Sequence, residues 1–154
     1  MADDFLCAWW ACLRAAVRLE SRYESRDGGT ATGRFDVSTI AEDEATLRME
    51  ETGVMRLSDG TETRAGNRLR WTRTADGIAL AHLRAASPTP LLVFGDSGGA
   101  HSPHLCGADV YTARCVLLPD GFLLQWEIRG PRKRDRLEQR YVSVPASTSP
   151  NGLG

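Results

Sequence analysis

Apolar and polar residues alternate along most of this chain, in short runs that turn residues interrupt. Phe35 and Val37 alternate with polar neighbours, and so do Leu69 and Trp71 further along. Such alternation places the apolar side chains of a strand on one face, so each run predicts a half-buried β-strand. Further strands are expected over residues 47–49, 78–83, 91–94, 109–118, 122–129 and 136–144, with turns at 59–60, 76–77, 120–121 and 130–131. The chain is therefore predicted to be mainly β.

The number of strands indicates the architecture. About nine or ten antiparallel strands in series are typical of a sandwich or of an up-and-down barrel. Closure into a barrel removes the exposed edges that would otherwise pair with other chains. We expect one domain over residues 1–144, because a chain of 154 residues suits a single core. Residues 145–154 lack apolar periodicity and are expected to form a disordered tail.

The charge of the chain limits its partners. The formal net charge of -1 disfavours nucleic-acid binding, which requires a cationic surface. Acidic residues follow Met1 where a secretory signal carries basic ones, and Arg14 interrupts the apolar run after them. The sequence therefore predicts a cytoplasmic protein without a membrane span, whose four cysteines are reduced. The oligomeric state does not follow from these features.

Residues that carry reactive or hydrogen-bonding groups gather in two neighbouring segments, 104–111 and 126–133. His104, Asp109 and Tyr111 supply an imidazole, a carboxyl and a phenol, which are groups used in general acid/base catalysis. These three residues are therefore the candidates for catalytic residues. The alternative is a buried polar network that fixes the register of the strands. Neither a reaction nor a cofactor follows from the residues themselves.

Strand parity determines which of these side chains can meet. Asp109 and Tyr111 lie on one face of the strand that begins after Gly107, whereas His104 and Cys106 are expected on the other face. A β-bulge at Gly107 would bring the two pairs together. Such a bulge would favour a functional site.

Three residues of this region have the spacing of metal ligands. They are His101, His104 and Cys106. A metal site needs three or four convergent ligands and a further layer of partners, and spacing alone supplies neither. We therefore predict no metal site, a hydrogen-bonded His104 and a buried Cys106.

The segment from Gly95 to Pro103 is rich in Gly, Ser and Pro, so we expect a mobile loop there. Residues 95–99 match the letters around the nucleophile of trypsin-like serine proteases. A catalytic triad is defined by geometry rather than by a pentapeptide, and the chain is too short for the two packed barrels of those enzymes. We interpret the match as a glycine-rich loop.

Basic residues surround the turn at Gly130-Pro131. Arg132 and Lys133 lie in the turn, and Arg129 precedes it. A solvated hairpin tip accounts for such charges, and the alternative is a binding site for a carboxylate, a phosphate or an acidic partner. Because Arg129 precedes the turn, we expect its side chain to point along the barrel wall.

Two motifs carry a resemblance to a known family. They are His104-x-Cys106-x-x-Asp109-x-Tyr111 and Trp126-x-Ile128-x-Gly130-Pro131-Arg132-Lys133. Both resemble motifs of an uncharacterised family of lipocalin-like domains found in small intracellular proteins, and weaker agreement extends over residues 5–144. The resemblance implies a calycin-type antiparallel β-barrel with a short N-terminal helix.

The N-terminal segment supports two interpretations. Phe5, Trp9, Leu13 and Val17 follow the spacing of one helix face, whereas residues 13–19 also alternate as in a strand. Because the resemblance implies a barrel strand here, we expect a helical turn around residues 4–8 and a strand over residues 10–22.

These observations predict a barrel that binds a small, partly apolar or anionic ligand. Its aromatic walls would be Trp71, Tyr111 and Trp126. Its polar anchors would be His104, Asp109, Arg129 and Lys133. Two alternatives remain open, an acid/base enzyme that acts on a small molecule and an interaction module that uses the basic hairpin. A barrel of this size holds either one small ligand or a filled core.

Overall fold

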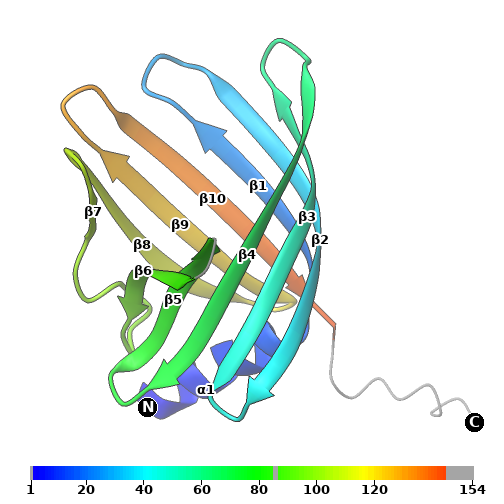
Figure 1. Ribbon diagram of the computed structural model, residues 1–154, viewed down its shortest axis with the longest axis vertical. Helices are drawn as coiled ribbons and strands as arrows, with labels where there is room; N and C mark the ends of the chain where they lie inside the picture. Colours follow the sequence, from blue (N-terminus) through cyan, green and yellow to red (C-terminus); the bar gives the residue numbers. More distant parts are fainter. Residues whose placement is uncertain (1, 85–86, 145–154) are drawn as a thin grey trace, which may run out of the picture.

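The protein folds as an antiparallel β-barrel with a helix at its N-terminus (Figure 1). The computed structural model describes residues 2–84 and 87–144, so the predicted tail at 145–154 lies outside the described residues. Helix α1 spans Ala2–Arg14. The strands of the described part are β1 (Ala16–Glu24), β2 (Thr30–Asp43), β3 (Thr46–Leu57), β4 (Glu62–Thr74), β5 (Gly77–Arg84), β6 (Ser87–Phe94), β7 (His104–Cys106), β8 (Asp109–Leu118), β9 (Gly121–Arg129) and β10 (Arg134–Ser143). The predicted mainly β barrel with a short N-terminal helix is confirmed.

The strands follow one another around the barrel in nearly the order of the sequence. The sheet order is β6-β5-β4-β3-β2-β1-β10-β9-β8-β7, and every neighbouring pair is antiparallel. The first and last strands are therefore paired with each other, and the two edges of the sheet are β6 and β7. Among the described strands, β6 and β7 do not pair with each other, so the barrel is nearly but not fully closed by strand pairing.

The alternation in the sequence becomes an alternation between the barrel interior and its outer surface. Phe35 and Val37 in β2 are buried, whereas the residues beside them are exposed. In β4, Leu69 and Trp71 are buried in the same way. In these strands the period-two pattern of the sequence therefore corresponds to a half-buried strand.

The segment between β6 and β7 closes the gap between the sheet edges at the helix end of the barrel. The backbone N–H of Cys115 in β8 donates to the Gly98 carbonyl oxygen at 2.8 Å, and that of Ala100 donates to the Ala113 carbonyl oxygen at 3.1 Å. On the other side, His101 donates to the Val93 carbonyl oxygen at 2.8 Å. The expected mobile loop is thus hydrogen-bonded to β6 on one side and to β8 on the other, because β7 pairs only with residues 109–111 of β8 and leaves backbone groups further along that strand free to pair.

The N-terminal segment differs from its prediction. Helix α1 extends to Arg14 and β1 begins only at Ala16, so residues 10–14 are helical rather than part of a strand. A helix forms here rather than a strand because helical spacing places Trp9 and Leu13 on one face. Both side chains enter one end of the barrel, where neither is exposed to solvent. Among the described residues, no helix combines the length and apolar character needed to cross a membrane.

Trp9 is the centre of an aromatic cluster that fills this end of the barrel. Its ring centroid lies 5.0 Å from that of Phe94, 5.7 Å from that of Trp71 and 5.9 Å from that of Phe122, each in an edge-to-face arrangement. Phe122 in turn stacks on Tyr141 at 4.6 Å. Edge-to-face packing is favourable for aromatic pairs, and so the helix acts as a plug for the barrel.

Removal of the Trp9 ring should destabilise the whole barrel. The Trp9→Ala variant leaves a cavity between α1 and three strands, and we expect it to lose about 3–5 kcal/mol of unfolding free energy. Urea denaturation followed by circular dichroism measures this loss. Ile40→Ala serves as the control, because Ile40 is 50% exposed, and it should change stability by less than about 0.5 kcal/mol. Equal effects of the two changes would contradict the plug.

The closing segment should depend on Gly98. Gly98 has φ +92°, and a Cβ atom there would lie 2.5 Å from the carbonyl oxygen of Cys115. Gly60 has nearly the same backbone angle, φ +89°, but nothing lies within 4 Å of its Cβ position. In urea denaturation, Gly60→Ala should cost about 1–2 kcal/mol from backbone strain alone. Gly98→Ala should cost at least about 1 kcal/mol more, because the hydrogen bond to β8 is also lost.

Candidate functional site

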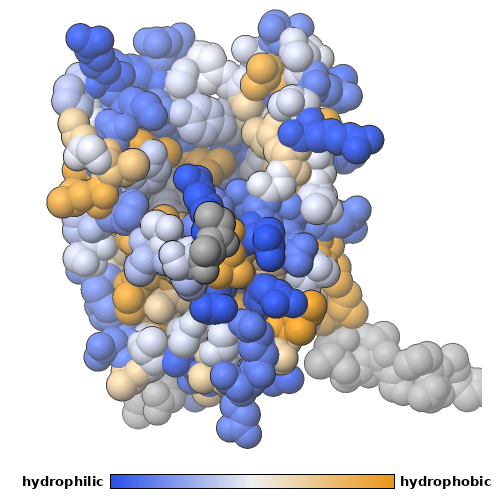
Figure 2. All heavy atoms as spheres, in the orientation of Figure 1, coloured by the Kyte–Doolittle hydropathy of each residue, from blue (hydrophilic) through white to orange (hydrophobic). Residues whose placement is uncertain are grey.

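A cavity of about 340 Å³ lies inside the barrel. Trp71 lines it and also contacts Trp9, so the aromatic plug forms one boundary of the cavity. Arg84 and Cys106 line it as well, and both are exposed residues, so the cavity reaches the surface. Figure 2 shows the upper half of this face hollowed, with hydrophobic atoms inside the hollow and hydrophilic atoms around it. The barrel is therefore packed at the helix end and hollow beyond it.

Most of the cavity wall is apolar. Its aromatic residues are Trp71, Tyr111, Trp126 and Tyr141, and its aliphatic residues are Leu69, Leu80, Leu91, Leu124, Ile128 and Leu137. These side chains belong to six strands, β4 to β6 and β8 to β10, and His104 and Cys106 of β7 complete the wall at the edge. A wall of this kind favours an apolar ligand surface.

His104 and Tyr111 meet across the hairpin between β7 and β8. The turn consists of Gly107 and Ala108, and it pairs Cys106 with Asp109 and His104 with Tyr111. Gly107 has φ +64°, which a glycine adopts without strain. Directly paired residues project to the same face, so the expectation that His104 and Tyr111 lie on opposite faces is wrong.

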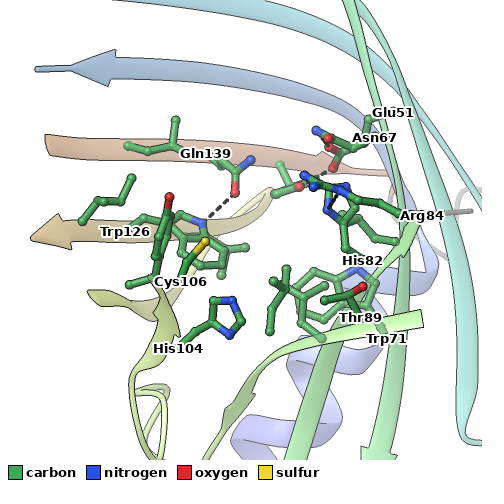
Figure 3. Close-up of a pocket in the computed structure, with 18 residues that line it drawn as sticks. Glu51, Asn67, Trp71, His82, Arg84, Thr89, His104, Cys106, Trp126 and Gln139 are labelled. Carbon is green, nitrogen blue, oxygen red and sulfur yellow. Dashed lines mark hydrogen bonds between the residues drawn. The ribbon is translucent and has the colours of Figure 1, made fainter. Parts of the chain in front are cut away.

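The rings of His104 and Tyr111 are packed edge to face. Their centroids are 6.0 Å apart. Figure 3 shows His104 and Cys106 on one side of the cavity, opposite His82 and Thr89. Cys106 is exposed at this wall, which corrects the expected buried thiol. The Cys106 thiol is exposed because β7 is a short strand at the edge of the sheet. In the described sheet, β7 pairs on one side only, with β8.

Three of the expected anchors do not line the cavity. Asp109 forms an ion pair with Lys133, whose Nζ lies 3.7 Å from its Oδ2. Gly130 makes room for this carboxylate, since a Cβ atom there would lie 2.0 Å from Asp109 Oδ1. Arg129 pairs with Glu127 on the outside, with its side chain 66% exposed. Because Ile128 points inward, its neighbour Arg129 points outward, and the expected placement inside the barrel is wrong.

The sequence analysis missed a buried carboxyl group in the cavity wall. Glu51 in β3 has no exposed surface. The Tyr141 hydroxyl donates a hydrogen bond to its Oε2, and Asn67 Nδ2 donates to its Oε1 at 3.2 Å. The available signal was the parity of β3, because Leu47, Met49 and Glu51 occupy successive inward positions.

Burial has the largest effect on the pKa of the Glu51 carboxyl. It raises the pKa of the Glu51 carboxyl, and the hydrogen bonds from Tyr141 and Asn67 oppose that rise. Burial and the neighbouring Glu51 raise the pKa of the Tyr141 hydroxyl well above its ordinary value. Compared with a solvated glutamate, Glu51 is therefore harder to ionise in the folded protein.

A second pair of polar residues lies where the cavity meets the surface. Arg84 Nε donates a hydrogen bond to Nδ1 of His82 at 3.0 Å. Burial and the charge of Arg84 lower the pKa of His82. On the opposite wall, Trp126 Nε1 donates to Gln139 Oε1 at 2.8 Å, as the dashed line in Figure 3 marks. Trp71 Nε1 is buried and has no hydrogen-bond partner among the described residues.

Metal ligands do not cluster in the part of the chain that the structure describes. No group of three His, Cys, Asp or Glu side chains is arranged there to hold a metal ion. His101 lies away from His104, because its Nε2 is 2.9 Å from the carbonyl oxygen of Asp76. All four cysteines are unpaired in this structure.

The fold and the cavity define the protein as a single-sheet antiparallel β-barrel with a plugged end and an internal pocket. Residues 7–143 match the model of a family described as "Family of unknown function (DUF6314)", and the chain belongs to this family. No curated protein matches its sequence significantly.

Two designed barrels are among the solved structures that are similar to this chain. One is a de novo designed fluorescence-activating β-barrel, with 13% identity, a TM-score of 0.42, and coverage of 87% of this chain and 97% of that one. The other is a redesigned β-barrel bound to DFHBI, with 13% identity, a TM-score of 0.37, and coverage of 84% and 97%.

Replacement of Glu51 by Gln should reveal the raised pKa through stability. A carboxyl whose pKa is higher in the folded state stabilises the fold fully below its unfolded pKa, near 4.5, and loses that contribution as pH rises toward the folded pKa. The unfolding free energy of the wild type should therefore fall relative to that of Glu51→Gln as pH rises above 4.5. Urea denaturation from pH 4 to pH 8 measures the difference.

The exposed Glu20 on β1 supplies the matched control. Because the Glu20 side chain is exposed, the difference between the wild type and Glu20→Gln should change less over this pH range than the difference for Glu51→Gln does. A difference for Glu51→Gln that stays constant over this pH range would contradict the raised pKa of the Glu51 carboxyl.

Proposed function

We propose that the protein binds a small, partly apolar ligand inside the barrel. The cavity carries this proposal, since its volume of about 340 Å³ falls within the range of roughly 300–1,000 Å³ that small-molecule sites occupy. Its wall combines a majority of apolar side chains with a few polar groups, which is the usual composition of such sites. Access from the surface completes the requirements for a binding pocket.

The polar groups of the wall give the ligand its orientation. His104, Gln139 and Asn67 line the cavity and retain hydrogen-bonding atoms beyond those that bind protein partners. The buried indole N–H of Trp71 lacks a partner among the described residues, and an acceptor on a ligand or a water would satisfy it. We further propose that the protein binds its ligand inside the barrel as lipocalin-like proteins do, and that the ligand enters at the end opposite the helix. We also propose that the protein acts in the cytoplasm.

An acid/base enzyme is the less favoured function. His104 and Tyr111 do lie together in the cavity wall, as such an enzyme would require. Asp109, the third candidate, is held by Lys133 and does not line the cavity. The interaction module would rest on Arg132 and Lys133, and Lys133 is engaged by that same ion pair.

Two adjacent positions in β7 provide a test of binding in the cavity. Cys106 lines the cavity, whereas Leu105 points to the outside and is 69% exposed. Thermal shift and native mass spectrometry of the wild-type protein against a small-molecule library should identify ligands. Cys106→Trp places a large ring in the cavity and should weaken their binding about tenfold or more. Leu105→Trp adds the same ring outside and should leave binding unchanged.

The proposal fails if no library member binds to the wild type. It also fails if both tryptophan variants bind the identified ligands as tightly as the wild type does. Circular dichroism of each variant verifies that the barrel is folded.

A further inference from the structure

The cavity mouth offers hydrogen-bond donors that form no salt bridge with a carboxylate of the described residues. Arg84 and His82 lie at the end of β5, and Figure 3 places both at the side of the cavity opposite His104 and Cys106. Arg84 uses only Nε in its hydrogen bond to His82, which leaves its two terminal nitrogens available. Within the described residues, no carboxylate forms a salt bridge with Arg84.

The contact between these two residues also fixes the proton on His82. Because Arg84 Nε donates to His82 Nδ1, that nitrogen must accept, and the ring carries its proton on Nε2. His82 is thereby a neutral donor rather than an acceptor on its free side. Arg84 and His82 together offer N–H groups and one full positive charge at the mouth.

Glu51 does not neutralise this charge. It is the carboxyl group in the cavity wall, and both of its oxygens already accept hydrogen bonds, from Tyr141 and Asn67. It has no exposed surface, and among the described residues no salt bridge joins it to Arg84. The positive charge at the mouth therefore has its natural complement in a ligand.

We propose that the ligand is a small organic oxyanion, a carboxylate or sulfonate, whose charged group binds Arg84 and His82 and whose apolar body enters the barrel. An arginine guanidinium matches the two oxygens of such a group, and charge-assisted hydrogen bonds are stronger than neutral ones. The apolar wall formed by Trp71, Leu124 and Trp126 accepts the remainder of the molecule. This inference rests on the proposed function and adds the chemical class of the ligand.

Two fluorescent probes that differ in their charge test the inference. The first is 1-anilinonaphthalene-8-sulfonate, and the second is N-phenyl-1-naphthylamine, which has the same aromatic body without the sulfonate. Fluorescence titration gives the Kd of each probe for the wild type and for Arg84→Gln. We expect this variant to bind the sulfonate about tenfold more weakly or worse, and the neutral probe within about twofold of the wild type.

Arg64→Gln is the matched control. Arg64 is exposed on β4 and does not line the cavity, and its replacement changes the net charge by the same amount. It should leave both Kd values unchanged. An equal loss of sulfonate binding in the two variants would show a general effect of charge and would overturn the inference.

The outcomes separate this inference from the proposed function. If Cys106→Trp weakens both probes while Arg84→Gln affects neither, or affects both equally, the cavity binds ligands but the oxyanion inference is wrong. The same conclusion follows if the wild type binds only the neutral probe. If the wild type binds neither probe, or if Cys106→Trp leaves both Kd values unchanged, the oxyanion inference is wrong. The proposed function fails as well only if no library member binds in the cavity.

Discussion

The packing of Trp9 into one end of the barrel is the contact on which the remaining structure depends. Its ring touches Trp71, Phe94 and Phe122, which belong to β4, β6 and β9, so one side chain joins both halves of the sheet. Aromatic rings bury large apolar areas, and this cluster concentrates the core at the helix end. The opposite half of the barrel lacks such a plug. The cavity is the consequence of this unequal filling.

The gap between β6 and β7 has a related effect on the site. Backbone hydrogen bonds of residues 95–101 close the gap at the helix end of the barrel. The three residues of β7 border the gap further from the helix. An edge strand this short covers little of the cavity, so His104 and Cys106 border on both cavity and solvent. Closure by a loop rather than by a long strand therefore gives the cavity its route to the surface.

Strand parity predicted the interior well within single strands and less well across turns. Trp71, Tyr111 and Trp126 were expected in the barrel wall, and the structure places them around the cavity. The relation of His104 to Tyr111 was misjudged, because a two-residue turn restarts the alternation on the same face. The N-terminal strand was misjudged as well, since the helical stripe could be recognised but its burial site could not.

The sequence by itself determined the alternation of most strands, the position of most turns and hence a mainly β fold, because these depend on local alternation and turn chemistry. Only the tertiary structure decided which polar groups share the interior. Glu51 and Tyr141 are 90 residues apart in the chain and meet because β3 and β10 curve around one cavity. The tertiary structure likewise places Arg84 and His82 of β5 at the same cavity as apolar side chains from β8 to β10. Such relations arise from the closure of the sheet, which no local pattern encodes.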